Sequence, residues 1–265
     1  MKRRIILHIG APKCGSTYLQ RVMLKNQRHL RAEGINYPHK GVGHPGNGVD
    51  IDQLTTPWII GAFQNAHTVV VSHETLFALP TMGIRLRNLC RNHDIELQIV
   101  AFFRRFSDVL FADYSQTLKQ GFNDFCQAGQ AFDGLDFLGF AKGRLAKVAP
   151  DLFLRDWQSH TPTTRLILAR HTEIRQTLER LLDIKTLDWS LPKWRANPSL
   201  RMCDCVEITR TINKGDIDRA EGQYRDAFAN AQLPDTGRTT ARAQYVETLF
   251  APRRMALARD FGVHL

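Results

Sequence analysis

IILHIGAPKCGST, residues 5–17, is the stretch that decides the fold of this 265-residue chain. An apolar run leads into a segment with two glycines and one lysine, and an amphipathic helical pattern begins at Thr17. Where a strand passes through a glycine loop into a helix, backbone N–H groups and the positive end of the helix dipole converge on one point. The stretch therefore predicts a phosphate-type anion loop.

Outward from this loop, apolar runs rich in β-branched residues alternate with amphipathic stretches, which is typical of a parallel sheet covered by helices. We expect strands at Arg4–Ile9, Thr68–Ser72, Glu96–Phe103 and Arg165–Ala169, and a weaker one at Ile35–Tyr37. We expect helices at Thr17–Arg31, Thr81–Asn92, Ser107–Gln120, Leu135–Lys147, Thr172–Leu182, Ser199–Asn213 and Arg242–Phe261. The sequence thus predicts an α/β, three-layer P-loop-like fold with a central parallel sheet of about five strands, in a single domain over residues 1–265.

Composition and charge narrow the choice of partners. The formal net charge of +10 favours anionic ligands, but the basic residues are scattered without a Lys/Arg block, so nucleic acid is not an expected partner. Five irregularly spaced cysteines argue against a disulfide framework and for a reducing compartment. No apolar run approaches the roughly 20 residues that a transmembrane segment needs. We therefore expect a cytoplasmic protein without a transmembrane segment.

The loop differs from that of an ATPase. Its glycines and Thr17 fall at the spacing of the Walker A pattern G-x-x-x-x-G-K-S/T, but Ser16 takes the place of the lysine. The lysine of this loop is Lys13, three positions earlier, and no predicted strand ends cleanly in an Asp that could hold magnesium through water. A P-loop phosphotransferase that uses ATP and magnesium is therefore an alternative that the spacing disfavours.

The displaced lysine resembles another family. Residues 12–17 are similar to the 5′-phosphosulfate loop of sulfotransferases that use 3′-phosphoadenosine 5′-phosphosulfate (PAPS), which reads Pro-Lys-Ser/Thr-Gly-Ser/Thr-Ser/Thr, and the residues around it resemble the opening of bacterial sulfotransferase-domain proteins. The resemblance implies PAPS as the cofactor and PAP as the product, with no metal required. It assigns the phosphosulfate to Pro12, Lys13, Cys14, Gly15, Ser16 and Thr17.

A second stretch, residues 104–116, resembles the pattern R-D-P-x-E-R-x-x-S-D-Y-T-Q of heparan-type glycan sulfotransferases. The resemblance implies that Arg104, at the end of the predicted strand, binds the 3′-phosphate. Ala112 stands where the pattern has its phosphate-binding Ser, so Arg104, Arg105 or Ser115 is expected to carry that contact.

Two residues after the predicted strand Thr68–Ser72 are candidates for the general base that takes the proton of the acceptor hydroxyl. Glu74 fits the glycan-type pattern, and His73 is the substitute; a helix cap or an ion pair with Lys13 would also explain Glu74. Lys13 is expected to neutralise the charge on the leaving phosphate oxygen. The glycine-rich segment Pro38–Asp50 is expected to be a long loop, in which His39 and His44 could contact the acceptor or simply lie on the surface.

Taken together, the resemblance implies an enzyme that moves a sulfuryl group from PAPS to a hydroxyl on a glycan or glycolipid. Basic charge suits an anionic glycan, and a lipid, a small alcohol and a peptide tyrosine are the alternative acceptors. Besides the ATP-magnesium phosphotransferase, a non-catalytic relative that binds PAP or a polyanion is the other alternative, for which Ala112 is the main argument.

Overall fold

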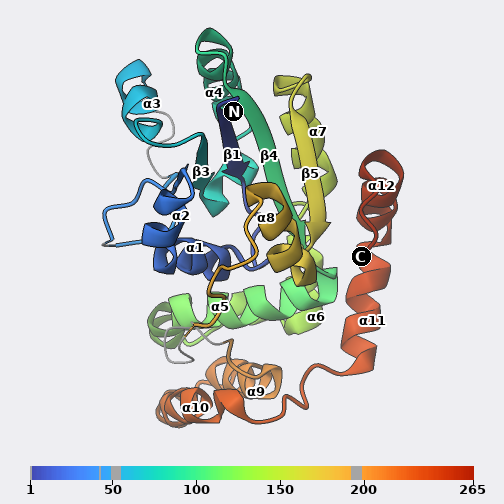
Figure 1. The fold of residues 1–265 in the computed structure, drawn as a ribbon. Helices are drawn as coiled ribbons and strands as arrows, with labels where there is room; N and C mark the ends of the chain where they lie inside the picture. The colour runs from blue at the N-terminus through green and yellow to red at the C-terminus, as the bar shows by residue number, and fades with distance from the viewer. Residues whose placement is uncertain (1, 42, 49–54, 192–198) are drawn as a thin grey trace. The chain divides into compact units, whose positions relative to one another are not determined.

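The computed structural model describes residues 2–41, 43–48, 55–191 and 199–265 (Figure 1). The strands are β1 (Arg4–His8), β2 (Ile35–Asn36), β3 (Thr68–Ser72), β4 (Glu96–Phe103) and β5 (Arg165–Arg170). The α-helices are α1 (Ser16–Lys25), α2 (Gln27–Ala32), α3 (Thr56–Ala62), α4 (Thr81–Asn92), α5 (Phe106–Ala128), α6 (Phe137–Arg144), α7 (Pro150–His160), α8 (Ile174–Leu182), α9 (Met202–Asn213), α10 (Ile217–Ala229), α11 (Thr240–Leu249) and α12 (Ala251–Phe261). A short 3-10 helix, η2 (Glu74–Ala78), follows β3 directly.

The five strands form one parallel sheet in the order β2-β3-β1-β4-β5, with β1 in the centre. Ile5, Ile6 and Leu7 of β1 are fully buried, as expected for a parallel strand covered on both faces. The register pairs His8 with Ser72 of β3 and with Val100 of β4. The predicted α/β fold with a five-stranded parallel sheet flanked by helices is therefore confirmed.

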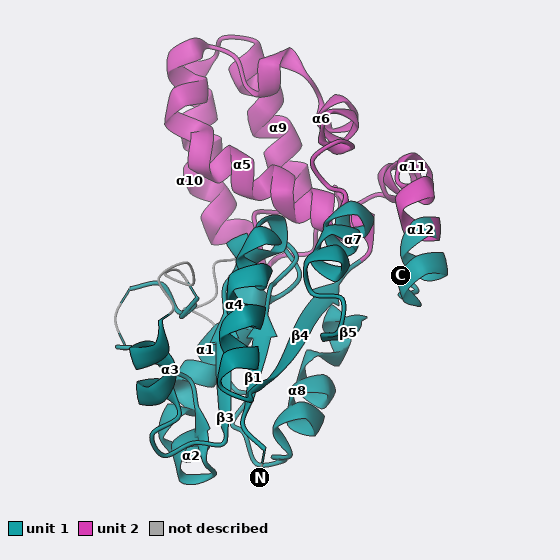
Figure 2. Cartoon of the chain, turned by 90° about the horizontal axis from the view of Figure 1, so that it is seen from above, with its two compact units in different colours: residues 1–104, 150–196, 256–265 teal, residues 105–149, 197–255 magenta. Residues whose placement is uncertain are grey.

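Helices cover both faces of the sheet. The connection from β1 to β2 runs in one direction across the sheet and the later connections run in the other, so right-handed crossovers place α1 and α2 opposite α3, α4 and α7. Figure 2 shows α4 and α7 in front of the strands and α8 behind them. The connections that follow β1 and β4 thus run in opposite directions from two neighbouring strands. In open α/β sheets, ligands bind at the carboxyl edge next to such a point.

The chain divides into two compact units, coloured in Figure 2. Unit 1, residues 1–104, 150–196 and 256–265, contains the sheet with α1–α4, α7 and α8. Unit 2, residues 105–149 and 197–255, contains α5, α6, α9, α10 and α11. Its core is aromatic, with the ring of Tyr114 against Phe132, Phe137 and Phe140. The sequence-based expectation of a single domain stays a prediction.

Two helices predicted as continuous are broken. The predicted helix Thr17–Arg31 is interrupted at Asn26, whose side-chain amide donates to the carbonyls of Val22 and Asp188. The predicted helix Arg242–Phe261 is interrupted at Phe250, two residues before a proline that lacks the N–H an interior helical position would donate. Helix α5, by contrast, continues beyond the predicted Gln120 to Ala128, and the left-handed Gly129 is its C-cap residue.

Three helices were not predicted: α3, α7 and α10. Each has a start signal that the alternation of apolar residues did not reveal. The side chain of Thr55 caps α3, Pro150 opens α7, and the carboxylate of Asp216 caps α10.

Candidate functional site

The loop between β1 and α1 has an unusual backbone. Gly10, Lys13 and Gly15 all have positive φ, at 54°, 61° and 93°. Left-handed residues in such a turn direct successive N–H groups toward a common concavity, which is the arrangement that binds anions. The loop between β1 and α1 therefore has a backbone of the kind that can bind an anion.

Both glycines are required by their surroundings as well as by φ. A Cβ on Gly10 would lie 2.6 Å from Ser16 Oγ and 3.1 Å from the Cα of Glu74, and a Cβ on Gly15 would lie 2.8 Å from Ile174 Cδ1 of α8. Gly10 thus allows Ser16, at the start of α1, and Glu74, just after β3, to approach the same loop. The loop brings Ser16 and Glu74 together, although they are far apart in the sequence.

Ser16 is the first residue of α1, and its hydroxyl is the most informative atom of the loop. The residue is 7% exposed, and its Oγ is buried without a hydrogen-bond partner among the described residues. A buried hydroxyl with no partner costs roughly 1–3 kcal/mol. A bound anion that accepts a hydrogen bond from this hydroxyl would remove that cost.

The amino end of α1 lacks a side-chain cap among the described residues. Its N-cap residue, Gly15, supplies no side-chain hydrogen bond, and the first turn contains no acidic residue. The free N–H groups and the helix dipole therefore favour an anion at this end. Thr17, in the same turn, is exposed, as is Pro12 on the loop, while Lys13 is half-buried.

Cys14 and Arg104 lie side by side. Burial raises the pKa of the Cys14 thiol to about 12, although the charge and the backbone N–H of Arg104 act in the opposite direction. The thiol donates to the carbonyl of Pro12 at 3.4 Å and is 5% exposed. Cys14 is thus a packed, protonated residue, and the structure places Arg104, the first residue after β4, against the loop.

The other two residues predicted for the 3′-phosphate belong to unit 2. Arg105 is exposed, and its Nε lies 3.7 Å from Glu247 Oε1. Ser115 is 1% exposed, and its hydroxyl accepts the backbone N–H of Leu200 at 2.8 Å. Unit 1 alone therefore brings together the loop, Glu74 and Arg104, but neither Arg105 nor Ser115.

His73 caps η2. Its Nδ1 accepts the backbone N–H of Thr75 at 3.3 Å and lies 2.7 Å from the Thr75 hydroxyl. Burial lowers the pKa of His73; the charge of Glu74 opposes this shift and His44 adds to it. The ring is therefore neutral with its proton on Nε2, and its remaining lone pair is already used. This arrangement favours Glu74 over His73 as a proton acceptor.

Glu74 has one engaged and one unengaged carboxylate oxygen. Its Oε1 lies 3.6 Å from His44 Nε2, whereas its Oε2 is buried and has no hydrogen-bond partner among the described residues. The proximity of its Cα to Gly10 places Glu74 beside the loop. The sequence-based expectation that Glu74 lies near the phosphate-type loop is consistent with this geometry.

The sequence did not reveal how firmly the long loop is attached to β3. Residues 38–41 and 43–48 have no regular structure, while the remainder of the predicted loop Pro38–Asp50 lies outside the described residues. Asn47 donates from Nδ2 to the carbonyl of Val70 and accepts the Ser72 N–H at Oδ1, at 2.9 and 2.7 Å. The N–H groups of Asn47 and Gly48 both donate to the carbonyl of Ser72. These contacts fix His44 beside Glu74.

Beneath the loop lies a buried polar chain. His8, at 1% exposure, has its Nδ1 2.7 Å from the hydroxyl of Ser72, and that hydroxyl accepts from the side-chain amide of Gln20 at 3.2 Å. Burial lowers the pKa of His8 to about 3. The ring is thus neutral and structural, as the sequence indicated for a histidine within the first strand.

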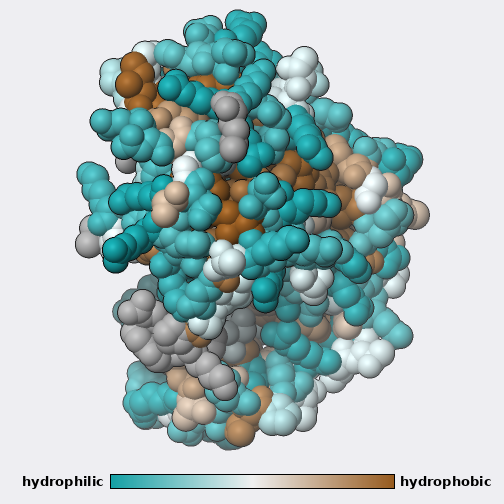
Figure 3. All heavy atoms as spheres, in the orientation of Figure 1, coloured by the Kyte–Doolittle hydropathy of each residue, from teal (hydrophilic) through white to brown (hydrophobic). Residues whose placement is uncertain are grey.

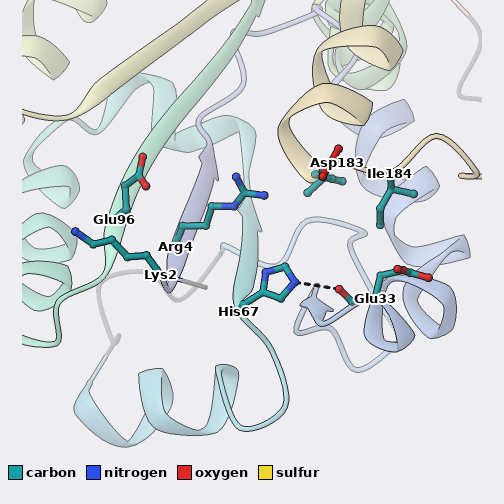
Figure 4. Close-up of a pocket in the computed structure, with 8 residues that line it drawn as sticks. Lys2, Arg4, Glu33, His67, Glu96, Asp183 and Ile184 are labelled. Carbon is teal, nitrogen blue, oxygen red and sulfur yellow. Dashed lines mark hydrogen bonds between the residues drawn. The ribbon is translucent and has the colours of Figure 1, made fainter.

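A hollow of about 400 Å³ lies at the opposite, amino-terminal edge of the sheet (Figure 4). Arg4 and Glu96, the first residues of β1 and β4, line it together with His67, whose Nε2 is 3.1 Å from the carbonyl of Glu33. None of the residues predicted from the sequence for the site lines this hollow. Its mixed charges do not define a ligand.

Net positive charge is concentrated in unit 1, which has 22 Lys and Arg residues against 13 Asp and Glu residues, whereas unit 2 has 14 and 13. Hydrophilic residues make up most of the surface in Figure 3.

Among the described residues, no group of three or more His, Cys, Asp or Glu side chains is arranged to hold a metal ion. In the same part of the chain, no helix combines the length and the apolar composition that a membrane crossing requires.

Comparison with known protein families and with curated proteins gave no match. The fold and the site define an α/β protein with a glycine-containing loop between β1 and α1 and with a carboxylate and an arginine beside that loop.

Proposed function

We propose that the chain is a PAPS-dependent sulfotransferase that sulfates a hydroxyl group on a glycan or glycolipid. The observation that carries the proposal is the buried, unpartnered hydroxyl of Ser16, in a loop whose lysine is Lys13 and not a residue at the Walker A position. The sequence resemblance of residues 12–17 to the phosphosulfate loop supplies the identity of the anion. The concentration of positive charge in unit 1 supports an anionic ligand.

The residues beside the loop fit such a ligand. Lys13, the hydroxyls of Ser16 and Thr17 and the first N–H groups of α1 would hold the phosphosulfate, and Arg104 would hold the 3′-phosphate. When bound, PAPS supplies the sulfuryl group and leaves as PAP. Arg105 and Ser115 are retained as candidates for the 3′-phosphate, and no metal is required because Lys13 provides the compensating charge.

Two side chains would do the chemical work. The Glu74 carboxylate would take the proton of the acceptor hydroxyl, since its Oε2 has no partner while the Nδ1 of His73 is already used. The ammonium of Lys13 would neutralise the negative charge that develops on the bridging phosphate oxygen as the bond to sulfur breaks. We further propose that the protein works in the cytoplasm, because all five of its cysteines are free thiols.

Calorimetric titration with PAP, ATP and GTP, each with and without magnesium, tests the cofactor assignment. PAP should bind without magnesium and should raise the melting temperature. Tighter binding of ATP with magnesium than of PAP would instead identify a phosphotransferase. PAP binding without sulfuryl transfer to any oligosaccharide or alkyl glucoside probe would identify a non-catalytic relative.

Glu74→Gln and His73→Asn test the base. Glu74→Gln should retain PAP affinity and abolish transfer, because it removes the proton acceptor at constant size. His73→Asn should keep most of the rate, since the Asn side chain can still accept the Thr75 N–H as the helix cap. A reversed outcome, with Glu74→Gln active and His73→Asn inactive, would move the base to His73.

A further inference from the structure

His44 belongs to no assigned part of the machinery, yet it is the side chain that faces the carboxylate of Glu74. Its Nδ1 accepts the backbone N–H of Gly46 at 3.1 Å. A ring nitrogen that accepts a hydrogen bond carries no proton, so the proton of the neutral imidazole is on Nε2. The Nε2 atom lies 3.6 Å from Glu74 Oε1. A shift of about 0.6 Å would bring the two atoms to the usual N–H···O distance.

Hydrogen bonds of His39 and Asn47 restrict the main chain around His44. His39 uses its Nδ1 to accept the Gly41 N–H, and its Nε2 therefore donates to the backbone carbonyl of His44, at 2.7 Å in both cases. Asn47, three residues later, is bonded to the backbone of β3 on both sides of its amide. The carbonyl of His44 and the main chain three residues later are thus held by hydrogen bonds.

Two ionisable groups lie next to this imidazole, Glu74 and His73. The rings of His44 and His73 are 5.1 Å apart and tilted by 50°. His73 has its own Nδ1 committed to Thr75 and so does not compete for Oε1 of Glu74. The two oxygens of the Glu74 carboxylate therefore differ. Oε1 lies toward His44, whereas Oε2 has no hydrogen-bond partner among the described residues.

We propose that His44 is a positioning residue for Glu74: its Nε2–H holds Oε1 and so keeps the carboxylate beside the loop, where it takes the acceptor proton. The inference rests on the proposed sulfotransferase function. It adds a residue from the loop after β2 to a site otherwise built from the ends of β1, β3 and β4.

The chain permits a paired test at position 44. His44→Asn keeps an acceptor at the place of Nδ1, where it can still accept the Gly46 N–H as in an Asx turn, but it lacks any atom at the place of Nε2. His44→Gln places an N–H donor at the reach of Nε2. His67→Asn is the control, because His67 is also a hydrogen-bonded histidine of unit 1 but lies at the opposite edge of the sheet (Figure 4).

With radiolabelled PAPS and a chitotetraose or dodecyl glucoside probe, His44→Asn should lower kcat about tenfold and leave PAP affinity and KM for PAPS unchanged. His44→Gln should recover most of that loss, and His67→Asn should match the wild type. In a Glu74→Gln background, His44→Asn should cause no further loss, because it acts through the carboxylate. A full additional loss in that background would overturn the inference.

A second readout does not need turnover. Long-range ¹H–¹⁵N NMR on the unliganded protein should find the His44 ring proton on Nε2, and Glu74→Gln should shift that proton's resonance while leaving the ring signals of His67 in place. A proton on Nδ1, or an unmoved resonance, overturns the inference even where the wild type transfers sulfuryl groups. A wild type that binds no PAP overturns the proposed function instead.

Discussion

Replacing Ser16 by Ala should stabilise the unliganded protein and weaken its binding of PAP. The hydroxyl is buried without a partner, and a buried unpaired hydroxyl costs roughly 1–3 kcal/mol, so its removal should raise the free energy of unfolding by about 1 kcal/mol. For a chain of this size, that gain corresponds to a melting temperature higher by about 2–4 °C. The substitution leaves no cavity of note, because it deletes one oxygen.

Binding should change in the opposite direction. A hydrogen bond to a charged group contributes about 1.5–3 kcal/mol, so PAP should bind Ser16→Ala about ten- to a hundredfold more weakly. Thermal unfolding and calorimetric titration of the same preparations give both quantities. Thr17→Ala is the matched control for stability, since Thr17 is exposed in the same turn and its hydroxyl is not trapped. A lower melting temperature for Ser16→Ala would refute the reasoning, because the hydroxyl would then have a favourable partner in the unliganded protein.

Three further predictions concern the loop and the strand before it. Lys13→Ala should lower turnover by orders of magnitude more than it weakens PAP binding, as steady-state kinetics and calorimetry will show; equal losses would make Lys13 an ordinary binding residue. Gly10→Ala should lower the melting temperature well beyond Gly41→Ala, because both have positive φ but only Gly10 has an atom within 3 Å of the new methyl group; equal effects would mean that backbone strain alone matters. Since the pKa of His8 is about 3 when folded and 6.5 ordinarily, the unfolded chain binds the extra proton, and stability should fall as pH decreases from about 6.5 toward 3, by up to roughly 1.4 kcal/mol per pH unit. His8→Asn should flatten this slope in urea unfolding at several pH values, and an unchanged slope would contradict the assignment.

The sheet could be predicted from the sequence because each strand is a short apolar stretch bounded by turn residues. Thr68–Ser72 and Glu96–Phe103 agree with the structure at both ends, and the other three predicted strands agree to within one residue at one end. The loop at residues 9–15 could be predicted for a similar reason, since its glycines and its lysine lie within one short segment. Local signals of this kind need no information about distant parts of the chain.

The rest depended on contacts between distant residues. The break at Asn26 arises from its bonds to Asp188, and the position of His44 beside Glu74 arises from bonds between Asn47 and β3. Neither pair has a spacing that a sequence pattern can register. The buried state of the Ser16 hydroxyl likewise depends on the close approach of Gly10 to it in the folded chain.

The side chain of Asn47 also covers an open edge of β3 that could otherwise pair with another chain. Strand β2 is two residues long and pairs only with Thr68 and Val69, which leaves the last part of β3 without a neighbouring strand on that side. The amide of Asn47 and the N–H of Gly48 occupy the backbone groups of Val70 and Ser72 that such an open strand would otherwise present to another chain. One asparagine thus substitutes for the missing length of β2. Asn47→Ala would expose these groups and should make the protein prone to self-association by strand pairing, detectable by light scattering at concentrations where the wild type does not associate.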